Sequence, residues 1–217
     1  MTQARRAGPT PAVDRWIRRF SLVKATFQFV APTTLTHVVL LLAAIAAAYA
    51  SFFSPPGTIG YLGAGLAIVM LSIAIIDGRS YVIPDWLNVA GGALGIMHAA
   101  AQEPDAVLPS VAEAALRGAV LALIFFAIRA GYARLRGRQG LGLGDVKLAF
   151  VAGVWLDWFI IPIAIELAAF AALSVYLLRQ ISCGRTLSPR SRIPFGLFFA
   201  PAIWICWVLE VRWAGAF

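Results

Sequence analysis

Residues Ile59–Ile76 read IGYLGAGLAIVMLSIAII and contain no charged side chain. A helix of this run is about 27 Å long at 1.5 Å per residue, close to the thickness of a bilayer's hydrocarbon core. The run therefore predicts a membrane-spanning helix. It ends at Asp77, and a carboxylate at membrane level is costly and usually has a function.

The composition of the 217-residue chain leads to the same class for its whole length. Hydrophobic residues make up 61% of it and charged residues 13%, with a mean hydropathy of +0.83, which is too apolar for a soluble domain. We predict an all-α fold, a polytopic transmembrane helix bundle with about seven spans. The predicted spans are Leu35–Phe53, Ile59–Ile76, Trp86–Ala101, Ala112–Tyr132, Lys147–Leu156, Trp158–Leu178 and Pro194–Leu209.

The stretch Val146–Leu178 is too long for one ordinary span and short for two. Basic clusters lie at both of its ends. If both clusters are on one side of the membrane, the stretch must cross twice. We therefore predict a helical hairpin that turns near Asp157.

The positions of the basic residues predict the orientation. With this hairpin, all but two of the 18 Lys and Arg residues lie on one side, the exceptions being Arg117 and Arg212. Because basic loops stay inside, we predict a cytoplasmic N-terminus and an outward C-terminus. Asp77, which ends the second span, and Asp145, which precedes the fifth, then share the cytoplasmic side.

We treat residues 1–34 as a basic amphipathic N-terminal segment on the cytoplasmic face, and residues 35–217 as the transmembrane domain. Apolar side chains in the segment recur at helical spacing, with basic ones on other faces, which is typical of a helix on an anionic leaflet. A signal peptide is the alternative, since Ala48-Tyr49-Ala50 resembles a cleavage site. The long stretch before the apolar run favours a retained helix.

Asp145 follows a glycine-rich turn, Gly140–Gly144, and is predicted in the first turn of a helix, where the helix dipole favours an anion. The residues leave two roles open: a cap of that helix, or a catalytic acid. Asp77 has two readings as well, a solvated interfacial acid paired with Arg79 or a partner of Asp145. Two carboxyl groups that meet share a proton and titrate as a pair.

The loop after Asp77 contains two helix breakers, Gly78 and Pro84, which predict that the helix ends directly after the acid. Asp85 comes just before the next apolar run. Its position predicts that its side chain caps the following helix.

Two further features lie near the predicted acids. Lys147 follows Asp145 by two residues, so that it either lowers the pKa of that carboxyl or extends to the membrane surface as an ordinary basic residue. Pro194-Phe195-Gly196 favours a helix start with close packing against a neighbouring helix. The segment is then either an ordinary small-residue helix interface, which we favour, or a part of the substrate groove beside the acids.

Taken together, these segments resemble the prepilin peptidases, a family of bacterial membrane aspartic proteases. Gly142 to Leu148 reads GLGDVKL and matches the family's Gly-x-Gly-Asp-Val-Lys-Leu signature. The loop after Asp77 contains Ile83-Pro84-Asp85, as in the family. Pro194-Phe195-Gly196 resembles the family's late Pro-Phe-Gly-Pro segment, with Leu197 in place of the second Pro.

The resemblance implies a multi-pass inner-membrane endopeptidase that removes the leader of a type IV prepilin or Flp-type pilin precursor at the cytoplasmic face. It implies Asp77 and Asp145 as the catalytic pair, with no metal and no cofactor, and possible contacts with the pilus assembly machinery. The substrate site would be shaped by Gly142, Gly144, Lys147, Asp85, Pro194, Phe195 and Gly196. The chain is most similar to the short forms of the family, which implies peptidase without N-methyltransferase activity.

Other classes predict different features. A proton-coupled transporter would use the same acids but needs internal repeats with broken helices, which are not evident. A presenilin-like intramembrane protease shares Gly-x-Gly-Asp but needs a Pro-Ala-Leu segment where this chain has Pro194-Phe195-Gly196. A non-catalytic scaffold remains open, whereas no nucleic-acid-binding module is present.

The remaining polar and aromatic residues in the apolar runs are predicted to be structural. His98 is expected to be a packed or interfacial histidine, and Glu166, inside a span, has no assigned role. Tryptophans near the predicted outer ends favour interface anchoring. They are Trp155, Trp158, Trp204, Trp207 and Trp213.

Overall fold

The computed structural model describes residues 57–137, 140–183 and 194–214, all within one compact unit, Ala44–Phe217. The predicted amphipathic segment 1–34 and the first predicted span, Leu35–Phe53, lie outside the described residues.

Each of the six later predicted spans coincides with a helix. The helices are α3 (Thr58–Ser80), α4 (Asp85–Gln102), α5 (Val107–Arg136), α6 (Leu143–Trp155), α7 (Ile160–Cys183) and α8 (Gly196–Ala214), with a short 3-10 helix, η1 (Pro104–Ala106), before α5. The chain turns between α6 and α7 at Asp157, as predicted from the length of that apolar stretch.

Four described segments are long and apolar enough to cross a membrane. They are Thr58–Ser80, Pro104–Arg136, Ile160–Leu178 and Gly196–Trp213. Helix α6 has 13 residues and α4 carries Asp85, Asn88 and His98 among its 18, so neither reaches that standard. Within these described ranges the protein is all-helical, with four helices of membrane-spanning length, but the predicted number of about seven spans is not confirmed.

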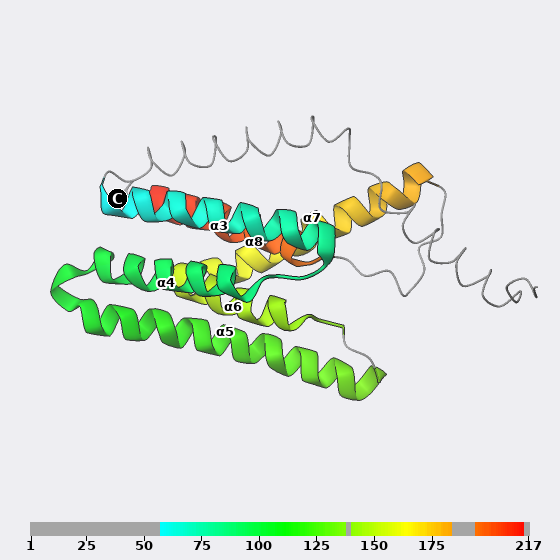
Figure 1. Cartoon of the computed structure of the whole chain (residues 1–217), viewed down its shortest axis with the longest axis horizontal. Helices are drawn as coiled ribbons and strands as arrows, with labels where there is room; N and C mark the ends of the chain where they lie inside the picture. Colours follow the sequence, from blue (N-terminus) through cyan, green and yellow to red (C-terminus); the bar gives the residue numbers. More distant parts are fainter. Residues whose placement is uncertain (1–56, 138–139, 184–193, 215–217) are drawn as a thin grey trace, which may run out of the picture. The chain divides into compact units, whose positions relative to one another are not determined.

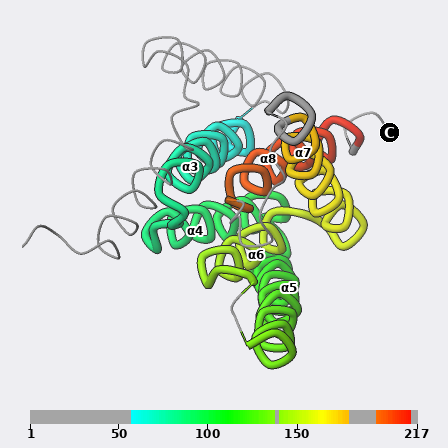
Figure 2. The backbone as a smooth tube through the Cα atoms, turned by 90° about the vertical axis from the view of Figure 1, so that its right-hand side faces the viewer, coloured from blue at the N-terminus to red at the C-terminus, as the bar shows by residue number. Residues whose placement is uncertain are grey.

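Successive helices of the bundle run in opposite directions (Figure 1). Helix α6 lies between α4, α5 and α8, whereas α3 packs on α4 and α8, and α7 packs on α8 (Figure 2). The end of α3 and the starts of α4, α6 and α8 therefore meet at one end of the bundle, which we call the acid end because it holds Asp77 and Asp145.

Glycines let the central helix approach its neighbours. A β-carbon on Gly153 of α6 would lie 2.6 Å from the Arg117 carbonyl oxygen of α5, and one on Gly118 of α5 would lie 2.9 Å from the Phe150 carbonyl oxygen. Small residues allow such close contacts between membrane helices. Because partners surround α6, seven of its residues are fully buried although the helix is only about 20 Å long.

A buried aromatic cluster joins α4, α6 and α8. His98 is 2% exposed, accepts a hydrogen bond from Trp207 Nε1 at 3.1 Å and stacks on Trp155 at 4.7 Å between ring centroids. The prediction of a packed histidine is confirmed. The prediction that Trp155 and Trp207 anchor the membrane interface is wrong, because both rings are buried and their indole N–H groups bond to the protein.

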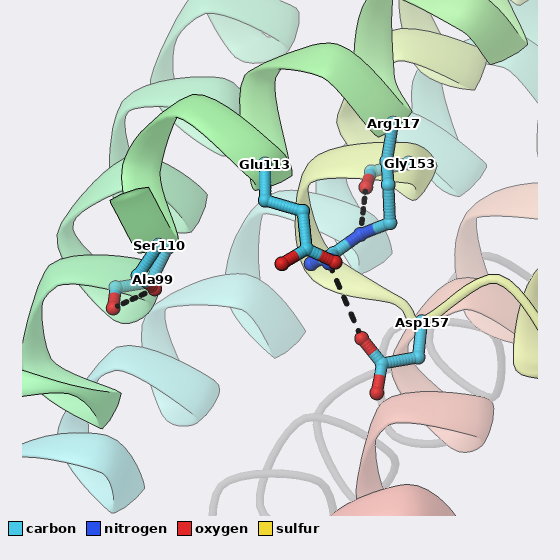
Figure 3. A network of polar contacts seen from close by, with 6 residues as sticks. All are labelled: Ala99, Ser110, Glu113, Arg117, Gly153 and Asp157. Carbon is cyan, nitrogen blue, oxygen red and sulfur yellow. Dashed lines mark hydrogen bonds and ion pairs between the residues drawn. The ribbon is translucent and has the colours of Figure 1, made fainter. Parts of the chain in front are cut away.

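The end opposite the acid end is tied together by Arg117 of α5 (Figure 3). Its Nε donates to the Gly153 carbonyl at 3.3 Å, and its Nη1 lies 2.9 Å from Glu113 and 3.4 Å from Asp157. Arg117 is one of the two basic residues that the predicted topology leaves away from the basic side. Its charge there has two carboxylate partners. The cluster fixes the α6–α7 turn to α5.

Candidate active site

Asp77 lies on the last turns of α3, where its side chain is 5% exposed. Its Oδ2 accepts a hydrogen bond from the backbone N–H of Leu197 at 3.0 Å, in the first turn of α8. A helix N-terminus stabilises a carboxylate through its free N–H groups and its dipole. Asp77 is therefore held by the protein, and the reading of it as a solvated interfacial acid is wrong.

Gly196 is the residue that permits this contact. A β-carbon there would lie 2.9 Å from Asp77 Oδ2 and 2.7 Å from Cδ1 of Ile83. The close packing expected of Gly196 is confirmed, and of the two readings of this segment the structure supports the one beside the acids. Pro194 and Phe195 precede the helix start, and the Phe195 ring packs on Phe199 with 5.1 Å between ring centroids.

Gly78 and Pro84 had predicted that α3 ends directly after Asp77, but the helix is longer. It continues to Ser80 and ends at Tyr81, whose left-handed φ of 57° lets its N–H bond to the Asp77 carbonyl at 2.9 Å. Gly78 instead makes room for α8, because a β-carbon on it would lie 3.2 Å from Leu197 Cδ1.

Asp145 is in the first turn of α6, as predicted. Its Oδ2 accepts a hydrogen bond from the Gly142 N–H at 3.1 Å, so that Asp145 does cap its own helix. The pKa of Asp145 is raised to about 6, mainly by burial; the Gly142 hydrogen bond opposes this rise and the charge of Asp77 adds to it. The two carboxyl groups are thus within electrostatic reach of each other.

The glycine turn before Asp145 lies close against its neighbours. A β-carbon on Gly140 would lie 2.7 Å from the Tyr132 ring of α5, and one on Gly144 would lie 3.0 Å from Cβ of Ile83. Arg129 of α5 donates to the Leu141 carbonyl at 2.6 Å. The glycines allow the close backbone approach that the sequence predicted, and Ile83 touches both Gly144 and Gly196.

Asp85 and Lys147 form an ion pair between α4 and α6, with 2.6 Å from Lys147 Nζ to Asp85 Oδ1. The prediction that Asp85 caps α4 is wrong, since Pro84 is the N-cap residue and the Asp85 side chain makes no cap bond. Both side chains are substantially exposed. The pair joins the first turn of α4 to the start of α6, close to Asp145 in the chain.

Sequence reasoning missed the partners of these residues. Leu197 acts through its backbone N–H and Ile83 through its methyl groups, and neither role has a signature in residue type. Asn88, a buried amide on α4, is visible in the sequence only as a polar residue within an apolar run. No group of three His, Cys, Asp or Glu side chains within the described ranges is arranged to hold a metal ion.

Residues 64–177 match the model of the type IV leader peptidase family, so that the matched region contains Asp77 and Asp145. The chain belongs to this family. The chain is 30% identical to the prepilin leader peptidase/N-methyltransferase of Aeromonas hydrophila, over 77% of this chain and 56% of that protein. No solved structure matches it.

Two further relatives also carry leader peptidase names. The prepilin leader peptidase/N-methyltransferase of Dickeya chrysanthemi is 32% identical over 74% of this chain and 54% of its own length. The leader peptidase HopD of Escherichia coli is 27% identical over 63% of this chain and 84% of its own length. The chain thus spans about half the length of the peptidase/N-methyltransferase relatives.

Proposed function

We propose that this chain is a membrane aspartic endopeptidase that removes the leader peptide from type IV prepilins or related Flp-type precursors at the cytoplasmic face of the inner membrane. One observation carries the proposal: Asp77, buried near the end of α3, and Asp145, in the first turn of α6, lie at the same end of the bundle, where Ile83 packs both on Gly196 beside Asp77 and on Gly144 beside Asp145. Two such carboxyl groups in reach of each other are the requirement of aspartic-type hydrolysis.

In this proposal, Asp77 and Asp145 share one proton, because two adjacent carboxylates do not both ionise readily. The ionised carboxylate takes a proton from a water molecule, which attacks the scissile carbonyl carbon. The protonated carboxyl donates a hydrogen bond to the carbonyl oxygen, and a proton then passes to the leaving amine as the C–N bond breaks.

The raised pKa of Asp145 supports the proposal that one carboxyl group of the pair is protonated. A carboxyl with a pKa of about 6 keeps its proton at a pH where an ordinary aspartate has lost it. The Gly142 N–H that now binds Oδ2 leaves the other oxygen of Asp145 for a water or a peptide.

The remaining site residues shape the groove for the substrate. Gly196 and Phe195 bring α8 beside Asp77, whereas Gly142 and Gly144 keep the turn before Asp145 thin. The Asp85–Lys147 pair closes the site between α4 and α6. Pro194 sets the start of α8 at the same end.

The placement of the acids suits a substrate that is itself a membrane helix. Large apolar side chains of α5 and α7 are exposed on the bundle, so an apolar helix can lie beside it in the lipid while the cut site reaches the water boundary. The positive-inside rule puts the acid end, which carries Arg134 and Arg136, at the cytoplasm.

The test is cleavage of a co-expressed type IV prepilin by wild type, Asp77→Asn and Asp145→Asn. These substitutions keep side-chain size but remove the shared proton, so that both variants are expected to leave the prepilin uncut. Asp105→Asn, in the exposed helix η1 of the described chain, is the matched control and is expected to cleave normally. Normal cleavage by either site variant would end the proposal.

A further inference from the structure

Asn88 of α4 is a buried amide without a partner. Its side chain is 6% exposed, and neither Nδ2 nor Oδ1 has a hydrogen bond. Among the described residues, the one other buried side-chain polar atom without a partner is Oε2 of Glu210, on the last turns of α8. An unpaired buried polar group destabilises the fold, so its retention in a packed seam calls for a cause.

The position of Asn88 follows from its neighbours along α4. Gly91 lies three residues further along the helix, on the same face, and a β-carbon on it would lie 3.0 Å from Val151 of α6 and 3.4 Å from Met70 of α3. Asn88 is therefore one turn nearer the acid end, at the seam where α3 and α6 meet α4.

The residues just before Asn88 belong to the candidate active site. Ile83 contacts Gly144, which precedes Asp145, and Asp85 pairs with Lys147. One helical turn is about 5.4 Å, so the amide lies about one turn deeper in the bundle than these contacts. A peptide held between α4 and α6 beside the acids would reach it.

The chemistry of the side chain fits a peptide main chain. A carboxamide offers N–H donors and a carbonyl acceptor, the complement of the C=O and N–H of one peptide unit. We propose that Asn88 is a substrate-binding residue that hydrogen-bonds the main chain of the prepilin next to the scissile bond. This inference rests on the proposed peptidase function. It adds to that site a residue that binds the substrate and takes no part in proton transfer.

The contacts between α4 and α6 on the acid-end side of Asn88 are ones that a peptide can replace. Lys147 and Asp85 are both well exposed, and exposed ion pairs contribute little to stability. Gly144 meets Ile83 only through apolar contact. A peptide strand that enters between α4 and α6 replaces these contacts, and the amide then gains the partners that it lacks in the free protein.

The experiment measures kcat and KM for cleavage of a purified Flp-type prepilin by the full-length protein in detergent, together with thermal stability. Asn88→Leu has nearly the same shape, and it removes the unpaired amide, so its stability is expected to equal or exceed that of wild type. Its kcat/KM is expected to fall at least about tenfold. Asn88→Thr, which keeps a donor and an acceptor, is expected to recover part of this loss.

Glu210→Gln is the matched control, because it changes the other buried side chain with an unpaired atom at a distance from the acids, and its kcat/KM is expected to match wild type. The dependence of cleavage on pH is expected to be the same in Asn88→Leu and wild type, since Asn88 does not titrate. A shifted pH profile would overturn the inference, because the amide would then act on the acids.

A stable Asn88→Leu variant that cleaves at the wild-type rate would also overturn the inference, and so would a loss of cleavage that parallels a loss of stability in both Asn88 variants. Failure of the underlying function has a different signature. In that case wild type itself leaves the prepilin uncut, whereas failure of this inference leaves wild-type cleavage intact and Asp145→Asn inactive.

Discussion

At Gly196, the start of α8 lies so close to the Asp77 carboxylate that there is room for a hydrogen atom on the Gly196 α-carbon but not for a side chain. The amide of the next residue, Leu197, binds the Asp77 carboxylate, and Ile83 fills the other side of the glycine. The orientation of Asp77 thus depends on a residue that has no side chain.

Gly196→Ala is expected to lose cleavage because the new methyl group must displace either Asp77 or Ile83. A displacement of about 1 Å at a catalytic group lowers rates by about 100-fold. Cleavage of a prepilin by the purified variant measures this. Gly131→Ala in α5, where nothing lies within 4 Å of the added carbon, is the control and is expected to be as active and at least as stable as wild type. Equal activity of the two variants would contradict the geometry.

Asp145 predicts a pH dependence of stability. Its pKa is about 6 in the folded protein and near 4 in an unfolded chain, so that the folded state holds a proton which the unfolded state has lost. Folding stability from this group is therefore fully present below about pH 4 and is lost as the pH rises through about 6, by about 1–3 kcal/mol.

Thermal unfolding in detergent between pH 4 and pH 7 measures this effect as the difference between wild type and Asp145→Asn. Wild type is expected to lose stability relative to the variant as the pH rises. A constant difference across this range would mean that Asp145 keeps an ordinary pKa in the folded protein.

Helix α6 is held by neighbours along its whole length. It is short, its buried face touches α4, α5 and α8, and its two ends are attached by different polar groups. Lys147 attaches the start to α4 at the acid end, and Arg117 attaches the far end and the following turn to α5. Stability and chemistry can therefore be separated along this one helix.

Arg117→Met is expected to lower thermal stability while cleavage at a permissive temperature stays near the wild-type level. The variant loses the hydrogen bond to the Gly153 carbonyl, at a cost of about 1–2 kcal/mol, but Glu113 and Asp157 remain solvated. Thermal unfolding and prepilin cleavage by the same preparation measure the two effects. Reduced cleavage without reduced stability would show that the far end of α6 takes part in the reaction.

The helices themselves could be predicted from the sequence, and the contacts between them could not. Apolar length and breakers determine where a membrane helix lies, so that six predicted spans coincide with helices. The pairing of Asp85 with Lys147 depends on α4 and α6 running side by side in the same direction, which residue order does not encode. An indole side chain suits the membrane interface and also a packed core that offers a carbonyl acceptor, so residue type alone does not distinguish the two. Trp155 was predicted at the interface, but its N–H donates to the Gly91 carbonyl in the core.

For the whole molecule, the alternation of the helices gives both acids one end of the bundle, and the positions of the basic residues predict that this end faces the cytoplasm. The topology predicted Asp77 and Asp145 at a common depth before any distance was known. What it could not predict is that α8 supplies the N–H that binds Asp77, because α3 and α8 are far apart in the sequence.

The orientation predicts the labelling of single cysteines by a membrane-impermeant maleimide in a cysteine-free background. Glu103→Cys, in the loop after α4, is expected to react from outside the inner membrane. Leu135→Cys at the acid end, where the side chain is 86% exposed, is expected to react only after the membrane is opened. The reverse pattern would put the acids on the outer face.

The central claim, that Asp77 and Asp145 act as one catalytic unit, is tested most directly by the rate of prepilin cleavage by the purified protein, each single Asn variant and the double variant. Groups that act as a unit are strongly non-additive, so each single substitution is expected to lower kcat by about 1,000-fold or more, and the double substitution by no more than either one. Two results would contradict the account. One is a double variant whose loss of kcat equals the product of the two single losses, and the other is normal cleavage by either single variant.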